Sequence, residues 1–297
     1  MLINKPLLRP LAVLVAMILV VAVVMVFPGW SRPSQPNTAD TGRRNVQESN
    51  QDEKDPPQDD AESTGEHQPP FDPPTPPASS ERIDERHRMV DTQIAGARDG
   101  RSRIRNEAVL EAMRIVPRHV FVPLDMRGHA YKDTPLPIGE GQTISQPYIV
   151  ALMTDLLELS PQSKVLEIGT GSAYQAAVLA QLTPHVYTIE IIEALADRAK
   201  QVLKQEEYDE VHCRHADGYN GWEEEAPFDA IIVTCASGHL PPPLWDQLKP
   251  GGRIVIPIGG IYELQRLVVL TKQKDGSRRS RTIISVRFVP MTRVESP

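Results

Sequence analysis

Apolar and polar residues follow two alternating patterns from about residue 81 to the end of the chain. Some segments repeat apolar residues three and four positions apart, as helices do, and others are short apolar runs typical of buried strands. The helical pattern predicts helices at 81–98, 106–116, 148–159, 174–182, 192–205 and 243–248. The short runs predict strands at 164–168, 185–190, 211–215, 229–234, 253–258, 266–271 and 282–289. Apolar strands that alternate with helices indicate an α/β fold with a parallel sheet covered on both faces.

The boundaries of these helices carry local signals. Asn106 is predicted to cap the second helix, which Pro117 ends, and Pro147 occupies a favourable first-turn position of the third. An open sheet of this kind binds its ligand beyond the carboxyl ends of its strands.

A different apolar pattern lies near the amino terminus. Residues 11–27 form an unbroken apolar run after Lys5 and Arg9. As a helix this run would rise about 26 Å, close to the thickness of a bilayer's hydrocarbon core. A cleaved signal peptide is the competing interpretation, but no small-x-small cleavage site follows the run. We therefore expect an uncleaved transmembrane anchor within residues 1–30.

Residues 31–80 are rich in Pro, Gln, Asp, Glu, Ser and Thr and contain few side chains that could be buried. The entropy of ordering such a segment is not offset by apolar burial, so we predict a disordered linker there. The predicted organisation is an anchor at 1–30, a linker at 31–80 and a folded domain at 81–297.

The net charge of −7 argues against a nucleic-acid partner, because phosphate backbones are held mainly by Lys and Arg. Cys213 and Cys235 provide neither a disulfide framework nor a metal-ligand spacing. We expect two reduced thiols and no metal site.

The strongest chemical signal is the segment Val165-Leu-Glu-Ile-Gly-Thr-Gly-Ser-Ala-Tyr174. A predicted strand enters a turn containing Gly169 and Gly171, and a predicted helix leaves it, so the backbone can approach a ligand closely. Glu190 ends the next strand, where a carboxylate can accept hydrogen bonds from both ribose hydroxyls. The sequence therefore predicts a nucleoside site.

The residues around this turn favour S-adenosylmethionine over NAD. A dinucleotide site has Gly or Ala three positions after the second glycine, where this chain has Tyr174. Glu167 would oppose a pyrophosphate but suits a ligand that carries an ammonium group. Asp217, after the following strand, can accept a hydrogen bond from the exocyclic amine of an adenine.

With these residues in place, the chain resembles the protein-L-isoaspartate (D-aspartate) O-methyltransferases from about residue 88 to 293. The most specific match is Leu136-Pro-Ile-Gly-Glu-Gly-Gln-Thr-Ile-Ser-Gln-Pro147. The runs Val116-Pro-Arg-His-Val-Phe-Val-Pro123, Leu248-Lys-Pro-Gly-Gly-Arg253 and Val286-Arg-Phe-Val-Pro290 agree as well. One local departure is Ala173, where the family loop usually has Gly.

The resemblance implies a Rossmann-like class I S-adenosylmethionine-dependent methyltransferase fold that releases S-adenosyl-L-homocysteine. Its acceptors would be isoaspartyl (and D-aspartyl) carboxylates in damaged peptides and proteins. Residues 143–145 would lie over the cofactor, with Ser145 as the catalytic-site residue; by position alone, Ser145 could equally be a helix-capping serine. The cofactor-binding residues it implies, together with those argued above, are Thr143, Ile144, Ser145, Gln146, Glu167, Gly169, Gly171, Glu190, Asp217, Gly218 and Thr292.

Three rival functions share the predicted fold. A nucleic-acid methyltransferase should show an Asn/Asp-Pro-Pro-Tyr/Phe type motif after the fourth strand, and residues 234–237 do not provide one. A methyltransferase with another acceptor, or a membrane-tethered module that binds the cofactor without turnover, remains an alternative. We expect a monomeric catalytic domain on the cytoplasmic side, where S-adenosylmethionine is made, held near the membrane by residues 11–27.

Overall fold

The computed structural model describes residues 71–97, 100–260 and 263–293. The predicted anchor and most of the predicted linker lie outside these residues. Within the described part of the chain, no helix is both long and apolar enough to cross a bilayer.

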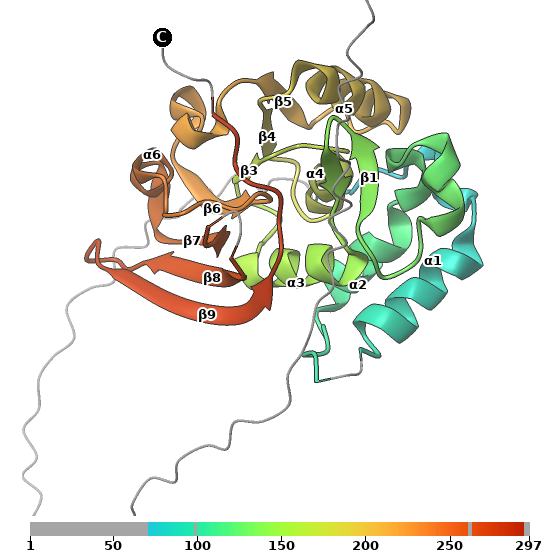
Figure 1. The fold of residues 1–297 in the computed structure, drawn as a ribbon, viewed down its shortest axis with the longest axis horizontal. Coiled ribbons are helices and arrows are strands. Elements are labelled where there is room, and N and C mark those ends of the chain that lie inside the picture. The colour runs from blue at the N-terminus through green and yellow to red at the C-terminus, as the bar shows by residue number, and fades with distance from the viewer. Residues whose placement is uncertain (1–70, 98–99, 261–262, 294–297) are drawn as a thin grey trace, which may run out of the picture.

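The centre of the fold is a seven-stranded sheet with the order β5-β4-β3-β6-β7-β8-β9 (Figure 1). Neighbouring strands from β5 to β7 run parallel, β8 is antiparallel to β7, and β9 is antiparallel to β8. The strands are β3 Val165–Ile168, β4 Val186–Glu190, β5 His212–His215, β6 Phe228–Val233, β7 Leu248–Ile258, β8 Gln265–Lys272 and β9 Arg278–Val286.

The prediction of a parallel sheet is therefore correct for five strands and wrong for the last two. A parallel neighbour requires a crossover connection of a dozen or more residues. Only residues 259–264 separate β7 from β8, and only 273–277 separate β8 from β9. These connections are too short for a crossover, so both strands turn back as hairpins.

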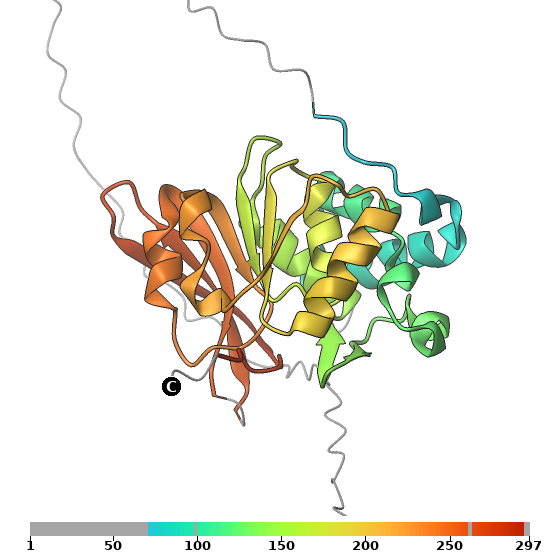
Figure 2. The same ribbon diagram turned by 90° about the horizontal axis from the view of Figure 1, so that it is seen from above.

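Helices cover both faces of the sheet (Figure 2). Alternate strand residues enter two separate apolar cores: Val165 belongs to the core that includes residues of α2, α3, α4 and α5, whereas Leu166 belongs to the core that includes Leu244 of α6. The helices are α1 Ile83–Met89, α2 Glu107–Ile115, α3 Pro147–Leu157, α4 Tyr174–Ala180, α5 Glu193–Gln205 and α6 Pro242–Asp246, and α1 continues as a π-helix at Val90–Ile94. Asn106 caps α2 as predicted, because its side chain accepts from the amides of Ala108 and Val109.

A small antiparallel hairpin, β1 Leu136–Gly139 and β2 Gln142–Ile144, was not predicted. Its turn residues Glu140 and Gly141 both have positive φ, 52° and 68°. Two such residues form the kind of turn whose twist matches that of paired strands. This hairpin carries Thr143 and Ile144 to the edge of the cleft described below.

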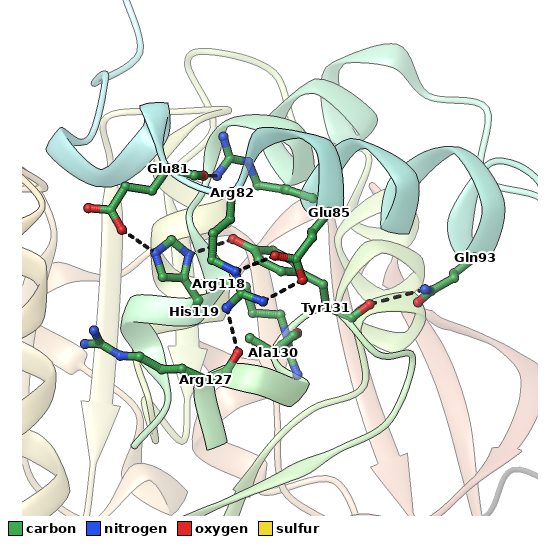
Figure 3. Close-up of polar contacts among 10 residues, drawn as sticks. Glu81, Arg82, Glu85, Gln93, Arg118, His119, Arg127, Ala130 and Tyr131 are labelled. Carbon is green, nitrogen blue, oxygen red and sulfur yellow. Dashed lines mark hydrogen bonds and ion pairs between the residues drawn. The ribbon is translucent and has the colours of Figure 1, made fainter. Parts of the chain in front are cut away.

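Residues 71–80 were predicted as linker, but they lie against the domain. The Ala78 amide donates to Glu206 Oε2 at 3.1 Å, and Gln181 Nε2 donates to the Pro74 carbonyl at 2.8 Å. Next to them, His119 lies between Glu81 and Tyr131, with ring nitrogens 3.0 and 2.8 Å from their oxygens (Figure 3). The composition of 71–80 did not predict these contacts, because backbone groups of this segment make them.

Candidate functional site

A cleft opens at the carboxyl ends of β3, β4 and β6, the edge at which an open α/β sheet binds its ligand. It lies between the loop after β3, the end of β4, the β1–β2 hairpin and residues 289–292. Of the predicted site residues, those that line it are Thr143, Ile144, Ser145, Glu167, Gly169, Gly171, Glu190, Gly218 and Thr292. The structure thus brings together residues from five separate parts of the sequence.

The loop after β3 owes its shape to its glycines. Gly169 has φ of +96°, and a Cβ there would lie 2.6 Å from Thr234 Oγ1. Only glycine fits both the conformation and the space. Thr234 in turn donates to the Ile168 and Gly169 carbonyls, at 2.9 and 2.7 Å. Thr234 was not predicted as a site residue, although its place at the end of a strand next to β3 is a signal for one.

Ala173 lies in the same loop and departs from the glycine pattern. Its backbone is left-handed, with φ of 69° and ψ of 4°, immediately before α4. The residue is fully buried and does not line the cleft. The departure therefore strains the backbone rather than crowding a ligand.

Glu167 is the most unusual group in the cleft. It is fully buried on β3, and Thr188 Oγ1 donates to its Oε2 at 2.7 Å. Among the residues that the structure describes, its other oxygen, Oε1, has no hydrogen-bond partner. Burial raises the pKa of this carboxyl to about 8, because water no longer stabilises the charged form. A cation placed here would restore the charge and satisfy the free oxygen.

Glu190, at the end of β4, holds the loop as well as facing the cleft. Its Oε2 accepts from the Gly171 amide at 2.7 Å, and its Oε1 accepts from the Ile191 and Ile192 amides at 3.0 Å each. Each carboxylate oxygen has two lone pairs. Oε2 can accept one further hydrogen bond, as the ribose assignment requires.

Ser145 lies between β2 and α3 and is half-buried at the cleft. The residue at the N-cap of α3 is Gln146, and no side chain at that position caps the helix. Instead, Asp133 reaches across from another segment and accepts from the Tyr148 amide at 3.0 Å and from Gln146 Nε2 at 2.9 Å. The helix-capping alternative for Ser145 is therefore not what the structure shows.

Two predicted cofactor residues do not line the cleft. Gln146 is engaged with Asp133. Asp217 accepts from the Tyr219 amide at 3.0 Å through Oδ1, and Arg293 Nε lies 3.3 Å from its Oδ2. Gly218, next to Asp217, does line the cleft, together with Cys235, whose thiol pKa burial raises to about 12.

A doubly covered sheet with a glycine turn after β3 and an acidic residue ending β4 is a Rossmann-like fold with a nucleoside site. The solved structures show that it is the class I methyltransferase form of this fold. A protein-L-isoaspartate O-methyltransferase superimposes with a TM-score of 0.59 at 26% identity, over 70% of this chain and 65% of that one. A Plasmodium falciparum protein assigned the same activity, solved in complex with S-adenosyl-L-homocysteine, gives 0.57 at 28% identity, over 64% of this chain and 92% of that one.

The family model for protein-L-isoaspartate(D-aspartate) O-methyltransferase matches residues 94–296, and the chain belongs to this family. The chain is 56% identical to protein-L-isoaspartate O-methyltransferase of Opitutus terrae over 212 residues, 71% of this chain and 88% of that relative. It is 59% identical to protein-L-isoaspartate O-methyltransferase 2 of Syntrophobacter fumaroxidans over 184 residues, 62% and 74% of the two chains. These matches confirm the resemblance noted from the sequence.

Proposed function

We propose that the chain transfers a methyl group from S-adenosylmethionine to the carboxylate of L-isoaspartyl and D-aspartyl residues in damaged proteins, and that it does so in this cleft. The observation that carries the proposal is the buried Glu167 with its free Oε1. A cationic, ammonium-bearing cofactor matches this oxygen, whereas a pyrophosphate would oppose it. Membership of the family indicates that the acceptor is an isoaspartyl or D-aspartyl carboxylate.

The cleft residues fit the cofactor in detail. Glu167 would hold the ammonium group, the backbone at Gly169 and Gly171 would lie along the nucleoside, and Glu190 would accept from a ribose hydroxyl. Gly218 lies where the adenine would end. The cofactor supplies an electrophilic methyl group on its sulfonium. Tyr174 stands where a dinucleotide site has a small residue, and its ring is fully buried, which disfavours NAD.

The chemistry makes modest demands on the protein. The acceptor carboxylate is ionised at neutral pH, so no general base is needed. The task of the chain is to hold the carboxylate in line with the methyl group, and well-oriented reactants gain several powers of ten in rate. We assign Ser145 the role of donating a hydrogen bond from Oγ to one carboxylate oxygen. Its place at the cleft and the absence of a capping role support this assignment.

After transfer, the methyl ester would cyclise to a succinimide without help from the protein and reopen partly to normal aspartate. The activity is thus a repair. A methyltransferase for another acceptor and a module that binds without turnover are the alternatives. Calorimetry with S-adenosylmethionine and NAD, run beside methyl transfer to an isoaspartyl peptide, separates the proposed function from both alternatives. Binding of S-adenosylmethionine without transfer to the isoaspartyl peptide would contradict the proposed function.

We also propose that residues 11–27 anchor the protein, that 31–70 form the linker, and that a monomeric catalytic domain faces the cytoplasm. The apolar run supports the anchor, and the need for S-adenosylmethionine supports the cytoplasmic side. The positive residues on both flanks of the run leave the charge rule nearly balanced. Protease added to intact spheroplasts should leave the domain uncut, and cleavage while the membrane stays sealed would place it outside.

A further inference from the structure

Arg118 is a charged side chain buried in the core without a carboxylate partner. It is fully inaccessible to solvent, and none of the ion pairs among the described residues includes it. Figure 3 draws it among the polar residues around His119 and Tyr131. Burial lowers its pKa only to about 10, so the guanidinium remains cationic at neutral pH. Burying an ion in this way has a large desolvation cost, which an apolar side chain at this position would not incur. Stability alone does not explain the residue.

The contacts of Arg118 connect the two ends of the β1–β2 hairpin. Nε donates to the Ala130 carbonyl, before the hairpin, at 2.8 Å, and Nη2 donates to the Ser145 carbonyl, after it, at 2.7 Å. The guanidinium also lies 4.8 Å from the centre of the Tyr174 ring. Tyr174 lines the cleft and begins α4, directly after the cofactor loop. One side chain therefore contacts both the segment that holds the acceptor and the helix that follows the donor site.

The other side of Ser145 is fixed by Asp133. Its carboxylate accepts from Gln146 Nε2 and the Tyr148 amide and pairs with Arg101 at 2.6 Å. The backbone around Ser145 is thus held from two directions. In the part of the chain that the structure describes, no hydrogen-bond partner is found for Ser145 Oγ itself. A hydroxyl without a protein partner on a firmly held backbone is suited to orienting a substrate group.

We propose that Arg118 is a positioning residue: through the Ser145 carbonyl and the Tyr174 ring it sets the distance between the acceptor-orienting hydroxyl and the methyl donor. This inference rests on the proposed role of Ser145. Arg118 does not line the cleft, so its effect should fall on the rate of transfer rather than on binding. A misplacement of about 1 Å can lower a rate roughly a hundredfold.

Arg86 provides a matched control. It is also almost fully buried, and its guanidinium donates to three backbone carbonyls, those of Ser79, Glu81 and Arg114. None of these residues lines the cleft. Lysine at either position keeps the charge but cannot make the same set of parallel hydrogen bonds. The two substitutions should therefore cost similar stability but differ in their effect on turnover.

The test measures kcat, peptide KM, S-adenosylmethionine affinity by calorimetry and the unfolding midpoint for Arg118→Lys, Arg118→Met and Arg86→Lys. We expect kcat to fall roughly ten- to a hundredfold in both Arg118 variants, with peptide KM and cofactor affinity close to wild type. Arg86→Lys should keep wild-type kcat. Unchanged kcat in a folded Arg118 variant would overturn the proposal. So would the failure of both Arg118 variants to fold while Arg86→Lys folds, since the guanidinium would then be structural.

A double-mutant cycle with Ser145→Ala separates this proposal from the one on which it rests. If Arg118 acts through Ser145, the effects of Arg118→Lys and Ser145→Ala on kcat should be strongly non-additive. Additive losses would refute the positioning role and leave Ser145 in place. Full activity of Ser145→Ala alone would instead refute the role of Ser145, and the Arg118 proposal with it.

Discussion

The substitution Ala173→Gly tests whether alanine, at a position where the family usually has glycine, strains the backbone. The left-handed conformation of Ala173 costs a residue with a Cβ roughly 1–2 kcal/mol. Replacing it by Gly removes this strain but also removes a buried methyl group, worth about 0.8 kcal/mol, and adds about 0.5–1 kcal/mol of unfolded-chain entropy. The terms nearly cancel, so Ala173→Gly should leave the free energy of unfolding close to that of the wild type.

Ala176 is the matched control, because it is equally buried, belongs to the same core and lies within α4. Ala176→Gly incurs the same two losses without relief of strain, and should cost about 1.3–1.8 kcal/mol. Urea denaturation, compared at equal slope, gives both values. The free energies of unfolding of the two variants should differ by about 1–2 kcal/mol, and Ala173→Gly should keep the cofactor affinity of the wild type. Equal destabilisation of the two variants would refute a strained Ala173.

Four further predictions concern the site and the boundary of the domain. Ser145→Ala should lower turnover while the unfolding midpoint and calorimetric cofactor affinity stay near wild type; a loss of roughly 1 kcal/mol in stability with intact turnover would indicate a cap. Glu190→Ala should weaken S-adenosylmethionine binding by about 1.5–3 kcal/mol and also destabilise the loop, whose Gly171 amide loses its acceptor; unchanged calorimetric affinity would remove the ribose assignment. Binding of S-adenosylmethionine at pH 7 should release protons from Glu167, which makes the binding enthalpy depend on the buffer. In Glu167→Gln the binding enthalpy should no longer depend on the buffer. Removal of residues 1–70 should leave a stable, active domain, whereas removal of 1–80 should lower its melting temperature, because Glu206 and Arg86 lose partners; equal melting temperatures would show that 71–80 contribute nothing.

The raised pKa of Glu167 also predicts how the stability of the folded protein depends on pH. Its folded pKa, about 8, lies above the ordinary value of 4.5, so the folded state binds more protons than the unfolded state between these values. This group therefore destabilises the cofactor-free protein progressively as the pH rises from about 4.5 to 8. Glu167→Gln should be more stable than the wild type at pH 8 and differ less at pH 5. A larger gain at pH 5 would contradict the buried, unpaired carboxyl.

Much of the site was predictable because its signals are local. The turn with Gly169 and Gly171 follows a strand, and Glu190 ends the next, so the order of elements places them at one edge of the sheet. Asn106 was predictable as a cap for the same reason. The contacts of Asp217 and Gln146 could not be predicted from the sequence, because their side chains bind Arg293 and Asp133, which are distant in sequence.

Other features of the structure could not be predicted from the pattern of apolar and polar residues. Arg118 lies between Pro117 and Pro123, and only the folded structure shows that its charge is buried among carbonyls. The antiparallel end of the sheet was missed because apolar runs do not report strand direction. Residues 71–80 were assigned to the linker from their composition, which does not report the backbone contacts that they make with Glu206 and Gln181.

The central claim is that this cleft methylates an isoaspartyl carboxylate. The direct measurement is transfer of labelled methyl from S-adenosylmethionine to a peptide containing one L-isoaspartyl residue, against an otherwise identical peptide with normal L-aspartate. The account predicts label on the isoaspartyl peptide alone, followed by loss of the ester as the succinimide forms. Equal labelling of both peptides, or no transfer by a protein that binds S-adenosylmethionine, would contradict it.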